Sequence, residues 1–339
     1  MNETVNIALP RVFALATEVL QSQGFSVEQA NAIATTVTAA ERDQCYSHGL
    51  FRIPFYIKAA SNSMSNAAAV PHISTSESSV LHVDAKAGFC PLALQVGMQP
   101  LIDKTKKSGI AALAIHNVYN IAALWPEVEH LANNGLVSFA FTAANAFVAP
   151  HGGTKPVFGT NPMAFGFPRV NQPPYVFDQA SSVSARGEIQ LHALAGKPIP
   201  DGWAIDSAGN PTTQAEDALK GAQLPFGGHK GSSIALMVEL LAGALIGDLF
   251  SYESSAKDLD KVGAPFGGEF LIAIDPAHAL QDGNVIAAQE RAEQLFSRVL
   301  EQEGTRLPSQ RRYDARKHTE SHGVHVSGDL HTRLTALIN

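Results

Sequence analysis

Apolar residues recur at helical spacing through the first fifty positions of the chain. They predict one helix over residues 11–23, ended by Gly24, and a second that begins at a capping box in which Ser26 is the cap and Gln29 reaches back. Continued in the same frame, the second helix includes residues 41–52, and Pro54 is expected to end or bend it. Its apolar face is formed by Val27, Ala30, Ile33, Ala34, Val37 and Ala40.

The pattern changes to short apolar runs after residue 79. These runs predict a strand over 80–84, a helix over 92–107 and a buried strand over 110–115. Further elements are expected as strands at 136–142, 163–167, 175–178 and 270–274, and as amphipathic helices at 287–303 and 329–338. The fold class is therefore α/β (α+β) with a multi-stranded sheet, and the two chain ends are expected to form one helical unit. The segment 187–224 is the longest irregular stretch, and long ordered loops often cover sites.

Composition describes a chain that buries a large core. Its 339 residues are 45% hydrophobic and 16% charged, with a mean hydropathy of +0.01, which suits two compact domains. A formal charge of -7 without charged blocks favours neither nucleic acid nor a membrane as a partner. The most apolar segment, residues 234–245, is too short to cross a bilayer, so we expect a buried helix. With only Cys45 and Cys90, and no signal-peptide pattern at residues 1–4, we expect a cytoplasmic protein.

A histidine and an arginine four residues apart carry the first chemical signal. His48 and Arg52 share a face if the second helix continues through them. A histidine transfers protons near neutral pH, and an arginine fork binds a carboxylate through two hydrogen bonds. The pair therefore suits chemistry beside a carboxylate, whereas a histidine without a chemical role is the competing interpretation. Ser47 precedes His48, but this segment is not the nucleophile elbow of a serine hydrolase.

Nucleotide-binding signals are present only in weak forms. The chain has neither G-x-G-x-x-G after a strand nor G-x-x-x-x-G-K-[ST], so a dinucleotide would bind through other residues. The candidates are the segments 159–162, 226–232 and 306–312. In the second, a glycine loop at a helix start favours phosphate and Lys230 adds positive charge, although a plain turn with a solvated lysine explains the same residues. Arg311 and Arg312 add weight to the phosphate interpretation, and a solvated basic surface competes with it.

Two further groups of residues carry less weight. Glu188 follows a predicted strand and could orient a protonated histidine, but a loop acid that faces water is favoured by the sequence alone. Neither Cys45 with His48 nor the group His318, His322 and His325 completes a zinc spacing, so we expect no metal site.

Motifs in order along nearly the whole chain resemble the malate/L-lactate dehydrogenase family that lacks the Rossmann fold. The matching segments are residues 41–43, Ser47-His48-Gly49 through Arg52-Ile53-Pro54, 158–162, 176–178, 225–231 and 306–308. Within that family, residues 121–125, 186–192 and 196–200 are similar to the bacterial Δ1-piperideine-2-carboxylate/Δ1-pyrroline-2-carboxylate reductases.

The resemblance implies a homodimer with its active site near the subunit interface. Residues 76–284 would form an α/β domain that binds NADPH, or NADH more weakly, and residues 1–75 with 285–339 would form a discontinuous helical domain. Ser47, His48 and Glu188 would form the proton-relay set, with Arg52 on the substrate. The cofactor would contact Asn120, Ile121, Ala122, Ala123, Leu124, Thr160, Val176, Phe177, Asp178, His229, Lys230, Arg306, Leu307, Pro308, Ser309 and Arg311.

The reaction implied is reduction of a small cyclic ketimine carboxylate to L-proline or L-pipecolate. Its carboxylate would bind Arg52, and His48 would donate the proton or keep the imine protonated, with help from Glu188 and Ser47. Glu188 stands where some relatives have Asp, and Asn120 where many have His. A 2-hydroxyacid dehydrogenase of the same family is the alternative, and a non-catalytic nucleotide- or anion-binding protein is a more remote one. The sequence leaves the preferred ring size open.

Overall fold

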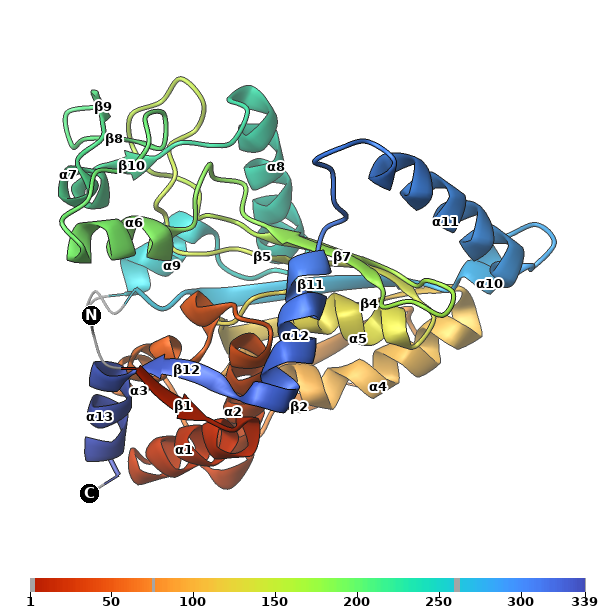
Figure 1. The fold of residues 1–339 in the computed structure, drawn as a ribbon, viewed down its shortest axis with the longest axis horizontal. Helices are drawn as coiled ribbons and strands as arrows, with labels where there is room; N and C mark the ends of the chain where they lie inside the picture. The colour runs from red at the N-terminus through yellow and green to blue at the C-terminus, as the bar shows by residue number, and fades with distance from the viewer. Residues whose placement is uncertain (1–3, 75–76, 259–262, 339) are drawn as a thin grey trace.

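A seven-stranded mixed sheet forms the centre of the molecule in the computed structural model, which describes residues 4–74, 77–258 and 263–338 (Figure 1). Its strand order is β2-β3-β4-β11-β5-β6-β7, in which β3 and β4 are parallel and the other neighbours antiparallel. The strands are β2 (His72–Ser74), β3 (Val80–Asp84), β4 (Ile110–Tyr119), β5 (Val137–Thr142), β6 (Met163–Phe167), β7 (Tyr175–Gln179) and β11 (Phe266–Ile274). The expected multi-stranded α/β sheet is therefore confirmed.

The two central strands are longer than their apolar runs predicted. β4 continues to Tyr119, four residues beyond the expected end, because Val118 and Tyr119 pair with Gly267 and Phe266 at the start of β11. His116 and Asn117 interrupt the apolar run, and Asn117 takes a positive φ of 53°. This polar irregularity hid the end of β4, because backbone pairing to a neighbour leaves no trace in the local pattern.

Helices cover both faces of the sheet. On one face, α4 (Cys90–Ser108) and α5 (Trp125–Asn133) pack against β4 and β11 in the largest apolar cluster. On the other face, α8 (His229–Glu239) and the π-helical turn η3 (Leu240–Ala244) pack through Val238 and Leu241, near α9 (Ser251–Lys257). The expectation of a buried helix over 234–245 is wrong for its outer face, which exposes Leu236, Met237, Leu240 and Leu245. No helix of the described residues is long and apolar enough to cross a membrane.

The two chain ends pack together. β1 (Thr4–Ile7) pairs antiparallel with β12 (Val324–Ser327), and α13 (Gly328–Ala336) packs in one apolar cluster with α1 (Leu9–Ser22), α2 (Val27–Arg42) and α3 (Ile53–Ala60). Figure 1 shows this group on the left, where both ends of the described chain lie.

The remaining C-terminal helices lie elsewhere. α11 (Val285–Leu300), preceded by the short α10 (Pro276–Ala279), contacts the far edge of the sheet, where Phe296 stacks on Tyr175 and Glu293 pairs with Arg169 at 2.6 Å. α12 (Gln310–His322) runs from there back to the N-terminal helices (Figure 1). The division into residues 1–75 with 285–339 and 76–284 stays a prediction, and its boundary at 75–76 lies outside the described residues. Residues 1–3, part of the segment without a signal-peptide pattern, also lie outside them.

Two expectations about helix ends need correction. Ser26 caps α2 by accepting the Gln29 N–H at 3.2 Å, but the Gln29 side chain does not reach back. Instead its Nε2 donates to the Ala69 carbonyl at 2.9 Å, because the side chain is fully buried beside the loop that follows α3. Pro54 neither ends nor bends α2; it lies in the first turn of α3, where proline costs no hydrogen bond.

The stretch expected as a loop over 187–224 has its own small fold. It contains α6 (Arg186–Leu194), α7 (Ala215–Lys220) and a three-stranded sheet in the order β10-β8-β9. Its strands are β8 (Ala204–Ile205), β9 (Pro211–Thr212) and β10 (Ala222–Gln223). A separate apolar cluster that includes Ile189, Ile199 and Ala218 holds this unit together. These strands of two residues are too short for a periodic signal, so the sequence did not reveal them.

Candidate functional site

The segment that carries His48 is not a continuation of α2. That helix ends at Arg42, Gln44 takes a positive φ of 56°, and two short 3-10 turns follow, η1 (Tyr46–His48) and η2 (Leu50–Arg52). The predicted helical stripe shared by His48 and Arg52 is therefore wrong. The two side chains nevertheless line one cavity, because the turns bring them to the same wall.

Glu41 explains why the chain turns here. Its Oε1 accepts the Leu50 N–H at 2.7 Å, and the carboxyl fills the space beside Gly49, where an added Cβ would lie 2.1 Å from Oε1. Glu41 is buried, and its Oε2 has no partner among the described residues. This carboxyl group accepts the one backbone N–H of Leu50 that a continued helix would bond internally, so it supports the turns that present His48 and Arg52.

The first cavity has a volume of about 170 Å³ and is suited to a small anion. Among the described residues, its walls contain two arginines and no carboxylate. Its walls are formed by His48, Arg52, Phe55, Asn120, Ile121, Ala122, Thr142, Ala143, Ala144, Phe147, Thr160, Pro162, Arg186, Gly187, Gln190, Gly263, Ala264 and Pro265.

His48 is held on two sides. The Ser47 hydroxyl lies 3.1 Å from its Nδ1, and the edge of the ring meets Trp125 at a centroid distance of 6.3 Å. Burial, with a smaller contribution from the Arg52 charge, lowers the pKa of His48 to about 3. His48 is therefore neutral at pH 7 in the free protein. Arg52 is fixed through Nε, which donates to the Ser47 carbonyl at 2.6 Å.

Asn120 joins the cavity to a buried acidic group. Its Nδ2 donates to Glu269 at 2.5 Å, and Glu269 also accepts a hydrogen bond from the Cys90 thiol at 2.9 Å. Burial raises the pKa of Glu269 to about 7, although these two hydrogen bonds oppose the shift. Sequence reasoning missed Glu269. The available signal was a lone acid inside the apolar run of β11.

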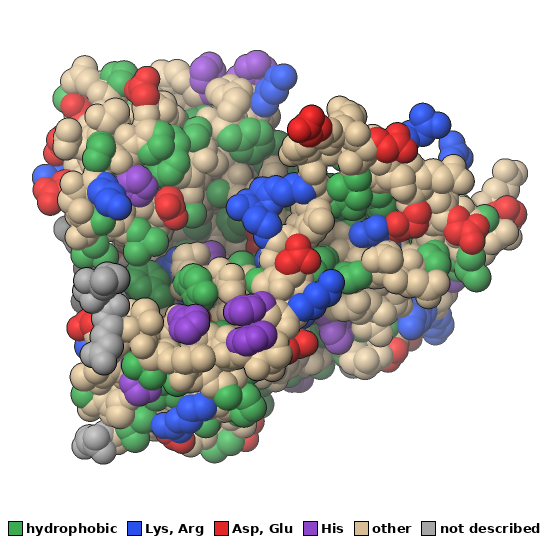
Figure 2. All heavy atoms as spheres, viewed as in Figure 1, with side chains coloured by type: hydrophobic (Ala, Val, Ile, Leu, Met, Phe, Trp, Pro, Cys, Tyr) green, Lys and Arg blue, Asp and Glu red, His purple; other side chains and the backbone are tan. Residues whose placement is uncertain are grey.

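A second cavity, of about 390 Å³, collects many of the predicted cofactor residues. It is lined by Val176, Phe177, Asp178, Gln179, Arg306, Leu307, Pro308, Ser309, Arg311 and Arg312. Figure 2 shows Lys and Arg side chains gathered beside a hollow near the start of α12. The cavity is therefore basic, as a site for phosphate groups requires.

A short loop connects the two cavities. Asn120, Ile121 and Ala122 line the first, and the N–H groups of Leu124 and Trp125 donate to Asp178 of the second at 2.8 and 3.1 Å. Burial raises the pKa of Asp178, with the two backbone hydrogen bonds opposing the shift. Residues 120–125 thus join a wall of the first cavity to Asp178 of the second through the backbone.

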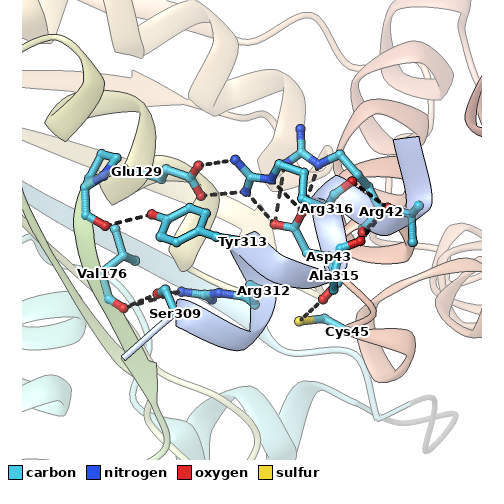
Figure 3. Close-up of polar contacts among 12 residues, drawn as sticks. Arg42, Asp43, Cys45, Glu129, Val176, Ser309, Arg312, Tyr313, Ala315 and Arg316 are labelled. Carbon is cyan, nitrogen blue, oxygen red and sulfur yellow. Dashed lines mark hydrogen bonds and ion pairs between the residues drawn. The ribbon is translucent and has the colours of Figure 1, made fainter. Parts of the chain in front are cut away.

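Helix α12 is fastened beside both cavities by the network in Figure 3. Arg316 pairs with Asp43 at 2.7 Å and with Glu129 at 2.6 Å, which ties α12 to the end of α2 and to α5. One turn earlier, Arg312 lies over the Trp125 ring at 4.9 Å. The ring that contacts His48 is therefore also a contact of the second cavity.

Some predicted site residues lie outside both cavities. Glu188 is 51% exposed and faces His192 at 3.9 Å, because α6 turns Arg186, Gly187 and Gln190 toward the first cavity and Glu188 away from it. The predicted contact between Glu188 and His48 is thus not made within the described chain. His229 and Lys230 begin α8 away from both cavities, while Ala123 and Leu124 are buried in the connecting loop. Among the described residues, no group of three or more His, Cys, Asp or Glu side chains is placed to hold a metal ion.

Glu41 predicts a pH dependence of stability. Burial raises the pKa of Glu41 from 4.5 to about 7, and the Leu50 hydrogen bond only partly opposes this. Between these two values the folded chain holds a proton that the unfolded chain has released, so the unfolding free energy falls as the pH rises. One such group contributes on the order of 3 kcal/mol across the interval.

The variant Glu41→Gln is expected to remove this slope, because glutamine still accepts the Leu50 hydrogen bond but does not titrate. Urea unfolding at several pH values across the interval measures it. Glu303→Gln, at an exposed acid, is the control and keeps the wild-type slope. An equal slope in Glu41→Gln and the wild type would contradict the assignment.

Comparisons with known proteins show a family match and close relatives along nearly the whole chain. The malate/L-lactate dehydrogenase family matches residues 7–335. The chain is 49% identical to the Δ1-pyrroline-2-carboxylate/Δ1-piperideine-2-carboxylate reductase of Pseudomonas aeruginosa, over 98% of this chain and 99% of that protein. It is 46% identical to the Δ1-pyrroline-2-carboxylate reductase of Ancylobacter novellus, over 99% of this chain and 98% of that protein.

A solved structure shows the same fold. The Δ1-piperideine-2-carboxylate reductase from Pseudomonas syringae pathovar tomato superposes with a TM-score of 0.92 at 38% identity, over 98% of this chain and 100% of that chain. The resemblance found in the sequence motifs is thereby confirmed over almost the full length. The chain belongs to the malate/L-lactate dehydrogenase family.

Proposed function

We propose that the protein reduces Δ1-pyrroline-2-carboxylate to L-proline and Δ1-piperideine-2-carboxylate to L-pipecolate, with NADPH as reductant. The observation that carries the proposal is the first cavity, which presents His48 and Arg52 on one wall and, among the described residues, no carboxylate. A small imino acid fits both its volume and its charge. The close similarity to reductases of this name supports the same reaction.

The residues of the first cavity suit substrate binding and proton transfer. Arg52 holds the substrate carboxylate, and the Ser47 hydroxyl keeps Nδ1 of His48 engaged, so that Nε2 faces the imine nitrogen. An anion beside Arg52 offsets the smaller, coulombic part of this shift, so substrate binding raises the pKa of His48, while burial continues to lower it. His48 then keeps the imine nitrogen protonated, which makes the adjacent carbon electrophilic.

The second cavity and the connecting loop suit a dinucleotide. When bound, the reduced nicotinamide supplies the hydride that adds to the imine carbon. The basic side chains Arg306, Arg311 and Arg312 would hold its phosphate groups, and residues 120–124 would lie along it toward the first cavity. A 2′-phosphate distinguishes NADPH from NADH and is commonly held by arginine, so these arginines support NADPH.

The variant Arg306→Gln tests the choice of cofactor. If Arg306 holds the 2′-phosphate, loss of a charge-assisted hydrogen bond raises the KM for NADPH by about 10- to 100-fold and leaves the KM for NADH nearly unchanged. Steady-state kinetics with each cofactor at saturating imine measures both. Arg298→Gln, at an exposed residue in the last turn of α11, is the matched control. Equal changes for the two cofactors would rule out this contact.

The reaction itself is tested by following NADPH absorbance with both cyclic imines and with pyruvate, side by side. Consumption with the imines and not with pyruvate supports the proposal. Reduction of pyruvate without an amine would instead identify a 2-hydroxyacid dehydrogenase, and cofactor binding without turnover would identify a non-catalytic protein.

We also propose a cytoplasmic homodimer. The exposed apolar side chains Leu236, Met237, Leu240 and Leu245 on the outer face of α8 and η3 support a subunit contact there, since large apolar groups rarely gather on a free surface. The two free cysteines, Cys45 and Cys90, are consistent with a reducing compartment. A monomeric mass in light scattering at micromolar concentration would contradict the dimer.

A further inference from the structure

Arg186 provides a second guanidinium in the wall of the first cavity. It is the first residue of α6, and it lines the cavity together with Gly187 and Gln190 of the same helix. Its guanidinium lies over the Phe147 ring at 4.3 Å. Nη2 donates to the Leu219 carbonyl at 2.8 Å, whereas Nη1 is buried and has no hydrogen-bond partner among the described residues. Nη1 therefore makes no hydrogen bond within the described chain.

The start of α6 also meets Arg52. A Cβ added at Gly187 would lie 3.5 Å from Nη2 of Arg52, so the Arg52 guanidinium lies against the first turn of the helix. The first N–H groups of a helix have no partner within the helix, and the positive end of its dipole adds to their attraction for anions. Two guanidinium groups and one helix start thus converge on a wall that, within the described chain, contains no acid.

Within the described chain, this arrangement lacks a counterion. A buried cation costs free energy unless a negative group accompanies it, and two cations in one small cavity repel each other. Burial lowers the pKa of Arg186 to about 10 and also lowers the pKa of Arg52. The first cavity is therefore arranged for an anion that the described residues do not themselves supply.

We propose that Arg186 and the first turn of α6 form, together with Arg52, a single site for the carboxylate of the substrate. This inference rests on the proposed function and extends it, because it assigns a second substrate-binding residue and makes the carboxylate the main determinant of recognition. The site selects planar ring 2-carboxylates over their neutral amides. Arg186 holds the carboxylate in place and takes no part in proton transfer.

The test uses pyrrole-2-carboxylate, a planar ring acid with no C=N bond to reduce, and its neutral amide. Binding of each is measured by calorimetry on the full chain, and KM and kcat are measured with NADPH and both cyclic imines. The variants are Arg186→Gln, Arg186→Lys and Arg52→Lys. Lys197→Gln, which removes an exposed charge just after α6, is the matched control. Thermal unfolding of each variant reports whether it folds.

Arg186→Gln is expected to weaken binding of pyrrole-2-carboxylate and to raise the KM for the imines by about 10- to 100-fold, as for loss of a hydrogen bond to a charged group. Its kcat should stay within about threefold of the wild type, and binding of the amide should not change. Arg186→Lys keeps the charge without the fork, so its acid binding and its KM for the imines should lie between those of Arg186→Gln and the wild type. The same is expected of Arg52→Lys. Lys197→Gln should behave as the wild type.

Two results would overturn the proposal. One is unchanged binding of pyrrole-2-carboxylate by folded Arg186→Gln, or by folded Arg186→Lys if the glutamine variant does not fold. The other is equal weakening of the acid and the amide, which would mark Arg186 as a structural residue. If wild-type protein binds the acid in an Arg186-dependent way but reduces no imine, the carboxylate site stands and the proposed function fails. If Arg186→Gln reduces both imines with unaltered KM, the proposed function stands and the carboxylate site fails.

Discussion

Replacement of His48 by Ala is expected to lower kcat for cyclic-imine reduction by about 10²- to 10⁴-fold, the usual range for a positioned proton-transfer group. Among the described residues that line the first cavity, His48 is the one titratable side chain besides Arg52 and Arg186. The variant should fold, because the ring makes one hydrogen bond to the adjacent Ser47 and an edge contact with Trp125. Single-turnover reduction at saturating NADPH measures the chemical step directly.

The control for this experiment is His325→Ala, at an exposed position of β12, which should retain wild-type turnover. His48→Ala with wild-type kcat would remove His48 from the mechanism. NMR titration of the His48 ring provides a second measure. In the free protein its pKa is about 3, and saturating pyrrole-2-carboxylate should raise the pKa by placing a negative charge beside Arg52. An unchanged pKa in the complex would show that the anion binds elsewhere.

Replacement of Arg316 by Ala is expected to destabilise the fold by about 3–5 kcal/mol, the cost of leaving buried charges without their partner. The Asp43 side chain is fully buried and that of Glu129 is 10% exposed, and Arg316 bonds both (Figure 3). Burial opposes ionisation of Asp43, yet Arg316 and Arg42 together lower its pKa, so the carboxylate is charged at neutral pH. After the substitution Asp43 retains Arg42, whereas Glu129 loses its ion-pair partner.

Urea unfolding measures this effect as a shift of the midpoint at constant slope. The matched control is Arg11→Ala, whose partner Glu18 is solvent-exposed, and whose pair contributes at most about 1 kcal/mol. If the two substitutions lowered the free energy of unfolding equally, burial of the Arg316 network would not matter for stability. Loss of α12 anchoring should also weaken binding of the proposed nicotinamide cofactor, because the same helix starts at the second cavity.

Elements with long periodic patterns were predictable from the sequence. α1, β3 and β6 follow from spacing alone, because their buried faces repeat every 3.6 or two residues regardless of what they pack against. α11 follows from its amphipathic pattern, although none of its residues is fully buried. The residue types at Ser47, His48 and Arg52 likewise pointed to carboxylate chemistry, and the motifs pointed to the family. These inferences depend on local chemistry or on order along the chain.

The tertiary structure decided how these residues meet. Glu41 interrupts the helical pattern through a single hydrogen bond to Leu50, nine residues later, and no periodic signal carries such a contact. Arg186 lines the first cavity only because α6 folds back over it. Arg316 bonds Asp43, which lies 273 residues earlier in the sequence. The sequence by itself determined the elements that have a clear periodic pattern and the chemical groups available. Only the packed chain determined their environment, because burial, partner and distance are properties of contacts between segments remote in sequence.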